Sequence, residues 1–254
     1  MISLNNIKEL HKLAEICGIH AGDGYLRSKN YHNELDISGS LEEKEYYDYH
    51  VSSLFKDVFN ININNRHFQS RNTYGFVIRD KEIIRFMHSL GFPYGKKTLT
   101  VKIPDFILNN KKLYSYFLRG YFDTDGCLTF TNKTGNYSLF KRIRHYYPRL
   151  QFSSVSVPLI NKVRFLLEKL NFKPFFNKYI PKRKNENIRN CLCLNGIDNL
   201  NNWLDKVGIC NPIQYSKYLI WKKFDFCPPK TTYEMRRKIL KGLIKPNSLY
   251  KEGL

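Results

Sequence analysis

One short pattern occurs twice in this chain, 102 positions apart. Residues 16–24 read ICGIHAGDG and residues 118–126 read LRGYFDTDG, so each copy has glycine at its third place and Asp-Gly at its end. Helix-compatible sequence precedes each copy, and a glycine after a helical run commonly ends the helix. We therefore predict two helices that stop at the final glycine of each copy, with Asp23 and Asp125 at their C-terminal ends.

Small residues within the two copies allow the predicted helices to pack closely. These residues are Gly18, Ala21, Gly22, Gly120 and Thr124. Close packing would place Asp23 and Asp125 side by side. Helix C-termini carry partial negative charge, so two carboxylates there repel each other unless a cation lies between them. A hard divalent ion, which takes oxygen ligands, would relieve that repulsion.

The paired motifs resemble those of a single-chain LAGLIDADG homing endonuclease. The matching positions are Gly18, Asp23 and Gly24 in the first copy and Leu118, Gly120, Asp123, Asp125 and Gly126 in the second. The resemblance implies that Asp23 and Asp125 bind Mg²⁺, for which Ca²⁺ or Mn²⁺ can substitute in structures, and that each acid acts on one DNA strand. It implies the backbone carbonyls of Gly22 and Thr124 as further ligands. The alternative is two buried helix ends with capping glycines and no active site.

The sequence around the motifs repeats one order of elements, helix, two strands, helix, two strands, helix. The predicted strands are 25–29, 32–37, 60–64 and 73–79 in the first half and 127–133, 149–154, 175–180 and 188–195 in the second. We predict an α+β fold of two pseudo-symmetric αββαββα halves, 1–112 and 113–227, whose antiparallel sheets form a DNA-binding saddle. A basic tail, 228–254, follows and either braces the first half or touches flanking phosphate.

The charge of the chain favours a polyanionic partner. Lys and Arg number 42 against 22 Asp and Glu, which gives a net charge of +20. Double-stranded DNA is the expected partner, with intron RNA as an additional one. The sequence contains no apolar segment long enough to span a membrane and no secretion signal at its start. We expect an intron-encoded, intracellular monomer with no membrane partner, whose six cysteines stay reduced.

Outward polar residues on the alternating strands are the predicted DNA contacts, because a two-stranded ribbon fits the major groove. They are Arg27, Lys29, Asn62, Asn64, Arg66, Gln69, Arg71, Lys133, Asn177, Lys178, Lys182, Arg183, Lys184 and Arg189. Phosphate contacts should dominate the affinity and make it steeply salt-dependent. The alternative is that these residues belong to ordinary solvated strand faces.

Accessory catalytic residues follow from the resemblance, which implies a Lys, Arg or Gln near the second or fourth strand of each half. The positions are Arg79, Gln151, Lys97 and Lys217. The first-half counterpart of Gln151 is Asp36, and the second-half counterpart of Arg79 is Asn195, so each half departs from the pattern differently. Surface charge or helix capping are the alternative roles. Asp123, whose counterpart is Ala21, is expected to be a helix-end acid and not an essential ligand.

Together, the motifs and the charge predict a site-specific endonuclease that makes double-strand breaks in a long, asymmetric DNA target. The reaction would be metal-dependent hydrolysis of phosphodiester bonds, and different strand residues in the two halves would read different half-sites. Two alternatives stay open on the same fold. One is an intron RNA maturase, and the other is a catalytically silent DNA-binding protein.

Overall fold

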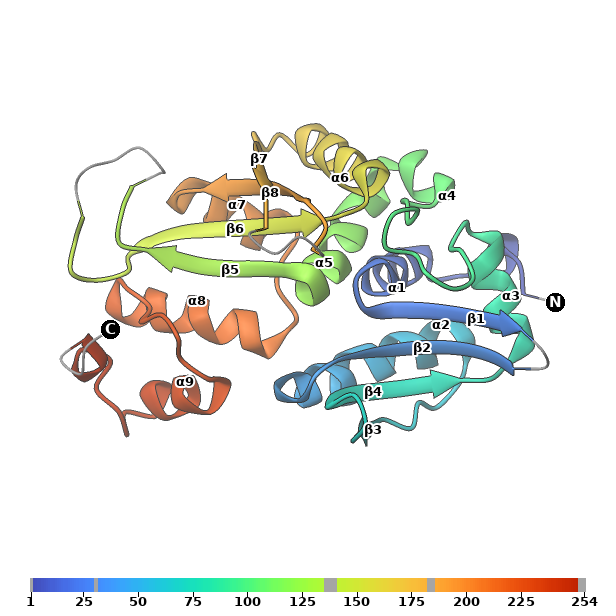
Figure 1. The fold of residues 1–254 in the computed structure, drawn as a ribbon, viewed down its shortest axis with the longest axis horizontal. Coiled ribbons are helices and arrows are strands. Elements are labelled where there is room, and N and C mark those ends of the chain that lie inside the picture. The colour runs from blue at the N-terminus through green and yellow to red at the C-terminus, as the bar shows by residue number, and fades with distance from the viewer. Residues whose placement is uncertain (1, 30–31, 135–140, 182–185, 251–254) are drawn as a thin grey trace.

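The structure is a computed structural model that describes residues 2–29, 32–134, 141–181 and 186–250. It contains two four-stranded antiparallel sheets, with strand orders β1-β2-β4-β3 and β5-β6-β8-β7 (Figure 1). The first half contains η1 (Leu4–Asn6), α1 (Leu10–Asp23), β1 (Gly24–Lys29), β2 (His32–Ser40), η2 (Leu41–Glu43), η3 (Tyr46–Val51), α2 (Ser52–Phe59), β3 (Arg66–Phe68), β4 (Thr73–Ile78), α3 (Lys81–Ser89) and α4 (Asp105–Leu108). The predicted α+β fold is thus confirmed.

The second half repeats the same order of elements. It contains η4 (Lys111–Leu113), α5 (Tyr114–Asp125), β5 (Gly126–Thr131), β6 (Tyr147–Ser154), α6 (Val157–Lys169), β7 (Phe175–Tyr179), β8 (Arg189–Asn195) and α7 (Ile197–Lys206), followed by α8 (Pro212–Phe224), α9 (Tyr233–Leu240) and η5 (Ser248–Tyr250). Strands β5 and β6 alternate, since their even-numbered residues up to Phe152 are buried and their odd-numbered ones are not. These two strands therefore pack one face on the core and leave the other accessible.

Helices α1 and α5 pack against each other at the centre of the molecule (Figure 1). A Cβ added to Gly18 would lie 2.2 Å from the carbonyl oxygen of Phe117, and one added to Gly120 would lie 2.2 Å from that of Glu15. No side chain fits at either place. The two glycines thus allow the backbone contact that the motifs predicted.

One predicted strand is wrong. Residues 60–64 form no strand, because Asn60 adopts a left-handed conformation (φ 54°) and ends α2. Ile61 and Ile63 are partly buried against the core. The side chain of Asn65 donates to the Tyr47 carbonyl and ties the segment to η3. Pairing with β4 begins only at Arg66, where the short β3 starts.

The C-terminal segment joins the two halves. Helix α8 lies along the free edge of β5, where Gln214 accepts a hydrogen bond from the Leu128 amide at 3.0 Å. Helix α9 then reaches the first half, where the Tyr233 hydroxyl donates to Glu45 at 2.7 Å and Arg237 pairs with Glu45 at 3.2 Å. Of the two roles predicted for the tail, these contacts support the brace. Within the described part of the chain, no helix has the length and hydrophobicity needed to cross a membrane.

Candidate active site

Asp23 ends α1 in a crowded polar environment. The Tyr47 hydroxyl donates a hydrogen bond to its Oδ2 at 2.6 Å. A Cβ added to Gly39 would lie 2.5 Å from Glu43 Oε2 and 2.8 Å from Asp23 Oδ2, so both acids reach the space above this glycine. Burial, and next the negative charge of Glu43, raise the pKa of Asp23 to about 7. Asp23 therefore sits among groups that already bind or repel its carboxylate.

Asp125 ends α5 in a more open position. Its side chain is exposed, and its Cγ would lie 3.4 Å from a Cβ added to Gly22. Partial desolvation raises the pKa of Asp125, while the positive charge of Lys97 opposes that rise. The charge of Asp125 also contributes to the raised pKa of Asp23. The two helix ends thus bring the acids close enough to repel each other.

Lys97 places its ammonium group at the C-terminal end of α1. Its Nζ donates to the carbonyl oxygens of His20, Ala21 at 2.8 Å and Gly22 at 2.6 Å. A helix C-terminus favours a cation there because its last carbonyls are unpaired. Burial lowers the pKa of Lys97 to about 8, although Asp125 and Asp23 oppose the change.

A cavity of about 260 Å³ opens at this point. Gly22, Lys97 and Asp125 line it from the helix ends, and Ser153 and Arg189 line it from the second sheet. An adjoining cavity of about 230 Å³ shares Ser153 and Arg189 and is also lined by Gln151. The two cavities together extend from Asp125 to Gln151 of the second sheet.

Two of the four predicted ligands, Gly22 and Asp125, line the cavity of about 260 Å³. The other two, Asp23 and Thr124, are their neighbours at the ends of α1 and α5 and are not among the lining residues. Mg²⁺ prefers such oxygen ligands. The Lys97 ammonium beside the Gly22 carbonyl shows that this place already attracts positive charge.

Of the four predicted accessory residues, Lys97 lines the cavity at Asp125. Arg79 is 70% exposed at its side chain and pairs with Glu34 at 3.3 Å. Lys217 belongs to α8, where its Nζ donates to the Leu128 carbonyl at 3.1 Å, at the edge of β5. Catalytic roles for Arg79, Gln151 and Lys217 stay predictions.

In the first sheet, the predicted DNA contacts share their face with acids. Arg27 lies opposite Glu34 in the β1–β2 ladder. Arg71 binds Asp36 at 2.7 Å. Arg66 also lies on this sheet, and Gln69 lies in the turn between β3 and β4. Asn62 and Asn64 precede the sheet, and the Lys29 side chain lies outside the described part of the structure.

In the second sheet, the registers place Gln151, Asn177 and Arg189 on the outward side. Asn177 pairs with Cys191 and Gln151 with Cys193, and Arg189 stacks on the Tyr179 ring at 4.9 Å. Lys178 pairs with Asn190 and so has the opposite orientation along β7, and Lys133 follows β5. Lys182, Arg183 and Lys184 lie outside the described residues.

Glu43 and Tyr47 lie beside Asp23 and were not among the predicted site residues. Glu43 forms a capping box with Ser40 at η2, a pattern that Ser-x-x-Glu indicates in the sequence. That pattern says nothing of where the carboxylate lies in space. Tyr47 contacts Asp23 across 24 positions of the chain, and its hydroxyl would lie 2.9 Å from a Cβ added to Gly39 of β2, so no local signal in the sequence identifies it.

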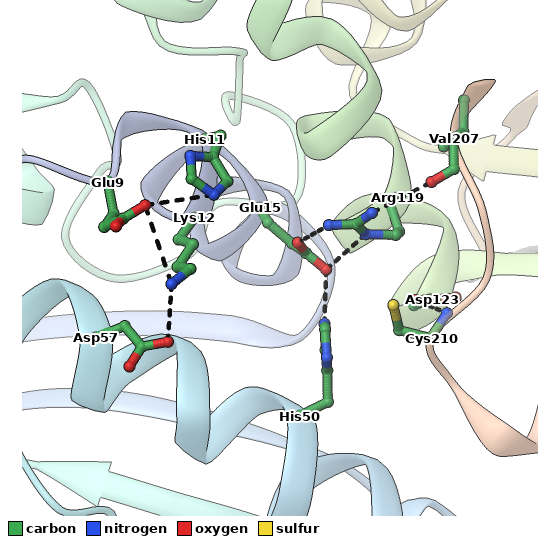
Figure 2. A network of polar contacts seen from close by, with 10 residues as sticks. All are labelled: Glu9, His11, Lys12, Glu15, His50, Asp57, Arg119, Asp123, Val207 and Cys210. Carbon is green, nitrogen blue, oxygen red and sulfur yellow. Dashed lines mark hydrogen bonds and ion pairs between the residues drawn. The ribbon is translucent and has the colours of Figure 1, made fainter.

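A second polar cluster joins the halves two turns earlier in α1 (Figure 2). Arg119 binds both carboxylate oxygens of Glu15, and His50 contacts the same carboxylate at 2.7 Å. Glu15, His50 and Cys210 place potential ligand atoms within 4.8 Å of one another. Arg119 already neutralises Glu15, and burial raises the pKa of Cys210 to about 12, so the thiol stays protonated. This cluster suits an ion pair better than a metal ion.

Residues 112–208 match the model of the LAGLIDADG-like domain. The match lies within the second half of this chain, which is therefore similar to a LAGLIDADG-like domain. Among curated proteins, the uncharacterized protein MJ0314 of Methanocaldococcus jannaschii is 29% identical over 174 residues. The match spans 66% of this chain and 57% of that relative, so the chain covers little more than half of the relative's length.

Solved structures show the LAGLIDADG arrangement for the whole chain. The meganuclease I-SmaMI bound to uncleaveable DNA is 11% identical, with a TM-score of 0.53 over 95% of this chain and 97% of that one. The homing endonuclease I-DmoI in complex with DNA and Mn is 14% identical, with a TM-score of 0.50 over 78% of this chain and 96% of that one. At these identities the likeness establishes the two-domain LAGLIDADG fold.

Proposed function

We propose that this protein is a site-specific homing endonuclease that cuts both strands of a long, asymmetric DNA target by metal-dependent phosphodiester hydrolysis. The observation that carries the proposal is the close contact of the two helix ends. A Cβ added to Gly22, the residue before Asp23, would lie 3.4 Å from Asp125 Cγ, and Asp125 and Lys97 line a cavity there. The fold is shared with I-DmoI and I-SmaMI structures that contain DNA, one of them with Mn.

We assign Asp23, Asp125 and the carbonyls of Gly22 and Thr124 as the groups that would hold Mg²⁺, with Ca²⁺ or Mn²⁺ as substitutes. When bound, the metal supplies charge stabilisation at the phosphate and lowers the pKa of its water. The protein's own part is to hold the two acids in place through the α1–α5 contact. Each acid then serves one DNA strand.

Lys97 is the basic group best placed to act in this centre. Its ammonium can shift from the α1 carbonyls toward a scissile phosphate, where negative charge increases during hydrolysis. Burial lowers its pKa to about 8, so Lys97 stays mainly protonated at neutral pH but gives up its proton more readily than an exposed lysine. It can therefore hold a proton for the leaving oxygen or orient solvent.

The outward faces of the two sheets form the proposed DNA surface. Arg27, Arg66 and Arg71 would contact one half-site, and Gln151, Asn177 and Arg189 the other. Because the first set lies among acids and the second does not, the two half-sites should differ in sequence. The net charge of +20 attracts the DNA phosphates, so the affinity for DNA should fall as the salt concentration rises.

A catalytically silent DNA-binding protein is the second candidate. Two contacts favour it. The Tyr47 hydroxyl binds Asp23 at 2.6 Å, and Lys97 binds the Gly22 carbonyl at 2.6 Å, so both groups already have partners. A bound metal would have to compete with these partners. Intron RNA binding remains the prediction made from the charge. We further propose an intracellular, monomeric, intron-encoded protein.

The deciding experiment measures cleavage and binding separately. A library of plasmids with randomised inserts is incubated with wild-type protein in Mg²⁺, and linear products are sequenced. For the enriched site, binding is then measured in Ca²⁺ for wild type, Asp125→Asn and Lys97→Met. The nuclease is supported if Asp125→Asn binds like wild type but does not cut. Sequence-specific binding without any Mg²⁺-dependent cutting by wild type would favour the silent DNA-binding protein.

A further inference from the structure

A separate cavity of about 460 Å³ lies between the edge of β5, helix α8 and the C-terminal segment. We call it the tail cavity. It is larger than the cavity at the acids and falls within the range of about 300–1,000 Å³ found for small-molecule sites. Residues that line it include Leu128, Phe130, Lys217, Pro228, Lys230 and Arg236. The proposed nuclease function makes no use of this space.

The tail cavity has cationic walls and no acidic ones. Lys217, Lys230 and Arg236 line it together with His145, and none of its lining residues is Asp or Glu. Like charges gathered in one cavity repel one another. Such a set is stabilised when an anion enters.

Arg236 is the clearest example of a cation in this cavity whose hydrogen-bond acceptors are all neutral. The residue is 2% exposed, and its guanidinium donates to Ser216 Oγ at 2.8 Å, to the Thr231 carbonyl and, at 3.4 Å, to the Ile213 carbonyl. All these acceptors are neutral, and among the described residues no carboxylate forms an ion pair with Arg236. The charge of Glu42 acts on Arg236 only as a contribution secondary to burial. A buried cation without a bound anion costs free energy.

Lys217 also donates its hydrogen bonds to neutral acceptors. Its Nζ donates to the Leu128 carbonyl at 3.1 Å and to Gln214 Oε1 at 3.0 Å, both neutral. The positive charge of Arg236 acts on Lys217 as a like charge. Two neighbouring cations thus line the cavity, and the hydrogen-bond acceptors described here for both are neutral.

The rest of the lining is neutral and partly apolar. Leu128 and Phe130 are buried in β5, and Pro228 follows the buried Cys227. The neutral polar residues of the lining are Thr129, Thr131, Asn132 and Thr231. An occupant that satisfies both kinds of wall carries an anionic group next to a flat or apolar one. A phosphate joined to a nucleoside has this composition, and phosphate is the anion that Lys and Arg together bind well.

We propose that the tail cavity binds a nucleotide unit, with its phosphate against Arg236 and Lys217 and its base against Phe130 and Pro228. Lys230, an exposed residue of the cavity lining, contacts the phosphate as well. The unit can be a free nucleotide or an end of a polynucleotide strand, since both present the same chemistry. The site lies outside the cavity at Asp125 and does not depend on cleavage.

The test is calorimetric titration of the whole protein with AMP, adenosine and inorganic phosphate. AMP should bind, and adenosine should bind at least about tenfold more weakly, because a hydrogen bond to a charged group contributes on that order. Arg236→Gln should weaken AMP binding by about tenfold or more, and Arg236→Lys by less. No AMP binding at millimolar concentration, or equal affinity for AMP and adenosine, would overturn the proposal.

Lys230→Asn keeps the test decisive if Arg236→Gln does not fold. Lys230 is exposed and has φ 56°, a conformation that Asn tolerates. This variant should weaken AMP binding several-fold, whereas Lys241→Asn, an exposed lysine outside the cavity wall, should not. Equal effects of the two variants would contradict the site.

Two further titrations distinguish the sources. A 5′-phosphorylated single strand that competes with AMP, and loses affinity in Lys230→Asn, identifies a polynucleotide end. AMP binding that neither single-stranded nor duplex DNA displaces identifies a free nucleotide. Each result retains the site and assigns its occupant. Loss of DNA cleavage in Asp125→Asn should leave AMP binding unchanged, so failure of one proposal does not imply failure of the other.

Discussion

The two ends of the motif helices carry the same aspartate in different surroundings. Asp23 receives a hydrogen bond from Tyr47 and lies beside Glu43, whereas Asp125 is exposed and faces a cavity with Lys97. The duplicated motif fixes the helix ends and their contact. It does not fix what folds over each end, so one sequence pattern produces two chemically unequal sites.

The sheets differ in the same way. The first sheet places Glu34 and Asp36 on its outward side, where they pair with Arg79 and Arg71. At the position of Asp36, between the same neighbouring strands, the second sheet has Gln151. The first sheet thus holds Arg71 and Arg79 in ion pairs, and the second sheet has a neutral glutamine at the position of Asp36.

The largest expected effect is on cleavage. Asp125→Asn and Asp23→Asn should each lower double-strand cleavage by about 1,000-fold or more, because each removes a charged ligand worth several kcal/mol. Strand-specific labelling of the DNA measures the residual nicking. Equal activity of Asp125→Asn and wild type on both strands would refute the shared centre. A dead Asp125 variant beside an active Asp23 variant would show that only one half is catalytic.

The second-largest effect is expected on stability, at the contact between Glu15 of the first half and Arg119 of the second. Glu15 is 1% exposed and bound by Arg119, so Glu15→Gln should lower the free energy of unfolding by about 3 kcal/mol. Burial alone would raise the pKa of Glu15, but hydrogen bonds from His50 and Arg119 lower it overall. The stability from its carboxylate is therefore full above the unfolded pKa near 4.5 and lost as pH falls through the lower folded pKa.

Urea unfolding of wild type and Glu15→Gln between neutral pH and pH about 3 checks this expectation. The difference between the two proteins should shrink as the solution becomes acidic. Lys12→Gln, which removes an exposed pair with Asp57, is the matched control and should cost less than about 1 kcal/mol. A difference that stays constant with pH would exclude the linkage.

A smaller effect is expected on the rate at which one of the two DNA strands is cut. Tyr47→Phe removes the hydroxyl that orients Asp23 and should slow cutting by the first half about threefold to tenfold. Tyr121→Phe, whose hydroxyl instead donates to the Ser153 carbonyl at 3.1 Å, is the control in the second half. Time courses of the two nicked intermediates separate the halves. An equal change on both strands would mean that Tyr47 acts on the whole centre.

The smallest effect concerns DNA affinity. Asp36→Asn releases Arg71 from its ion pair and removes a negative charge, so affinity in Ca²⁺ should rise by about threefold, with a salt slope steeper by about one. Gln151→Glu makes the reciprocal change in the second sheet and should weaken binding. Fluorescence anisotropy across a salt series measures both. If both variants bind like wild type, the strand faces do not contact DNA.

The sequence contained most of what positions the acids. Glycines at the third motif place predict the close α1–α5 contact, and Asp-Gly predicts the helix ends, because both are local requirements of the backbone. The prediction of a strand at 60–64 was wrong because an alternation of Asn and Ile also occurs in a coil whose isoleucines pack on the core. The contact between Tyr47 and Asp23 depends on how distant elements fold together, which no local pattern encodes.

The most direct test of the shared centre is selection of cleaved sequences from a randomised DNA library in Mg²⁺, with wild type and the Asp23→Asn, Asp125→Asn double variant in parallel. Wild type should enrich one asymmetric site of about 20 base pairs, since each sheet follows the groove for about one turn. The double variant and wild type with chelator should enrich nothing. The same products from the double variant would contradict the account.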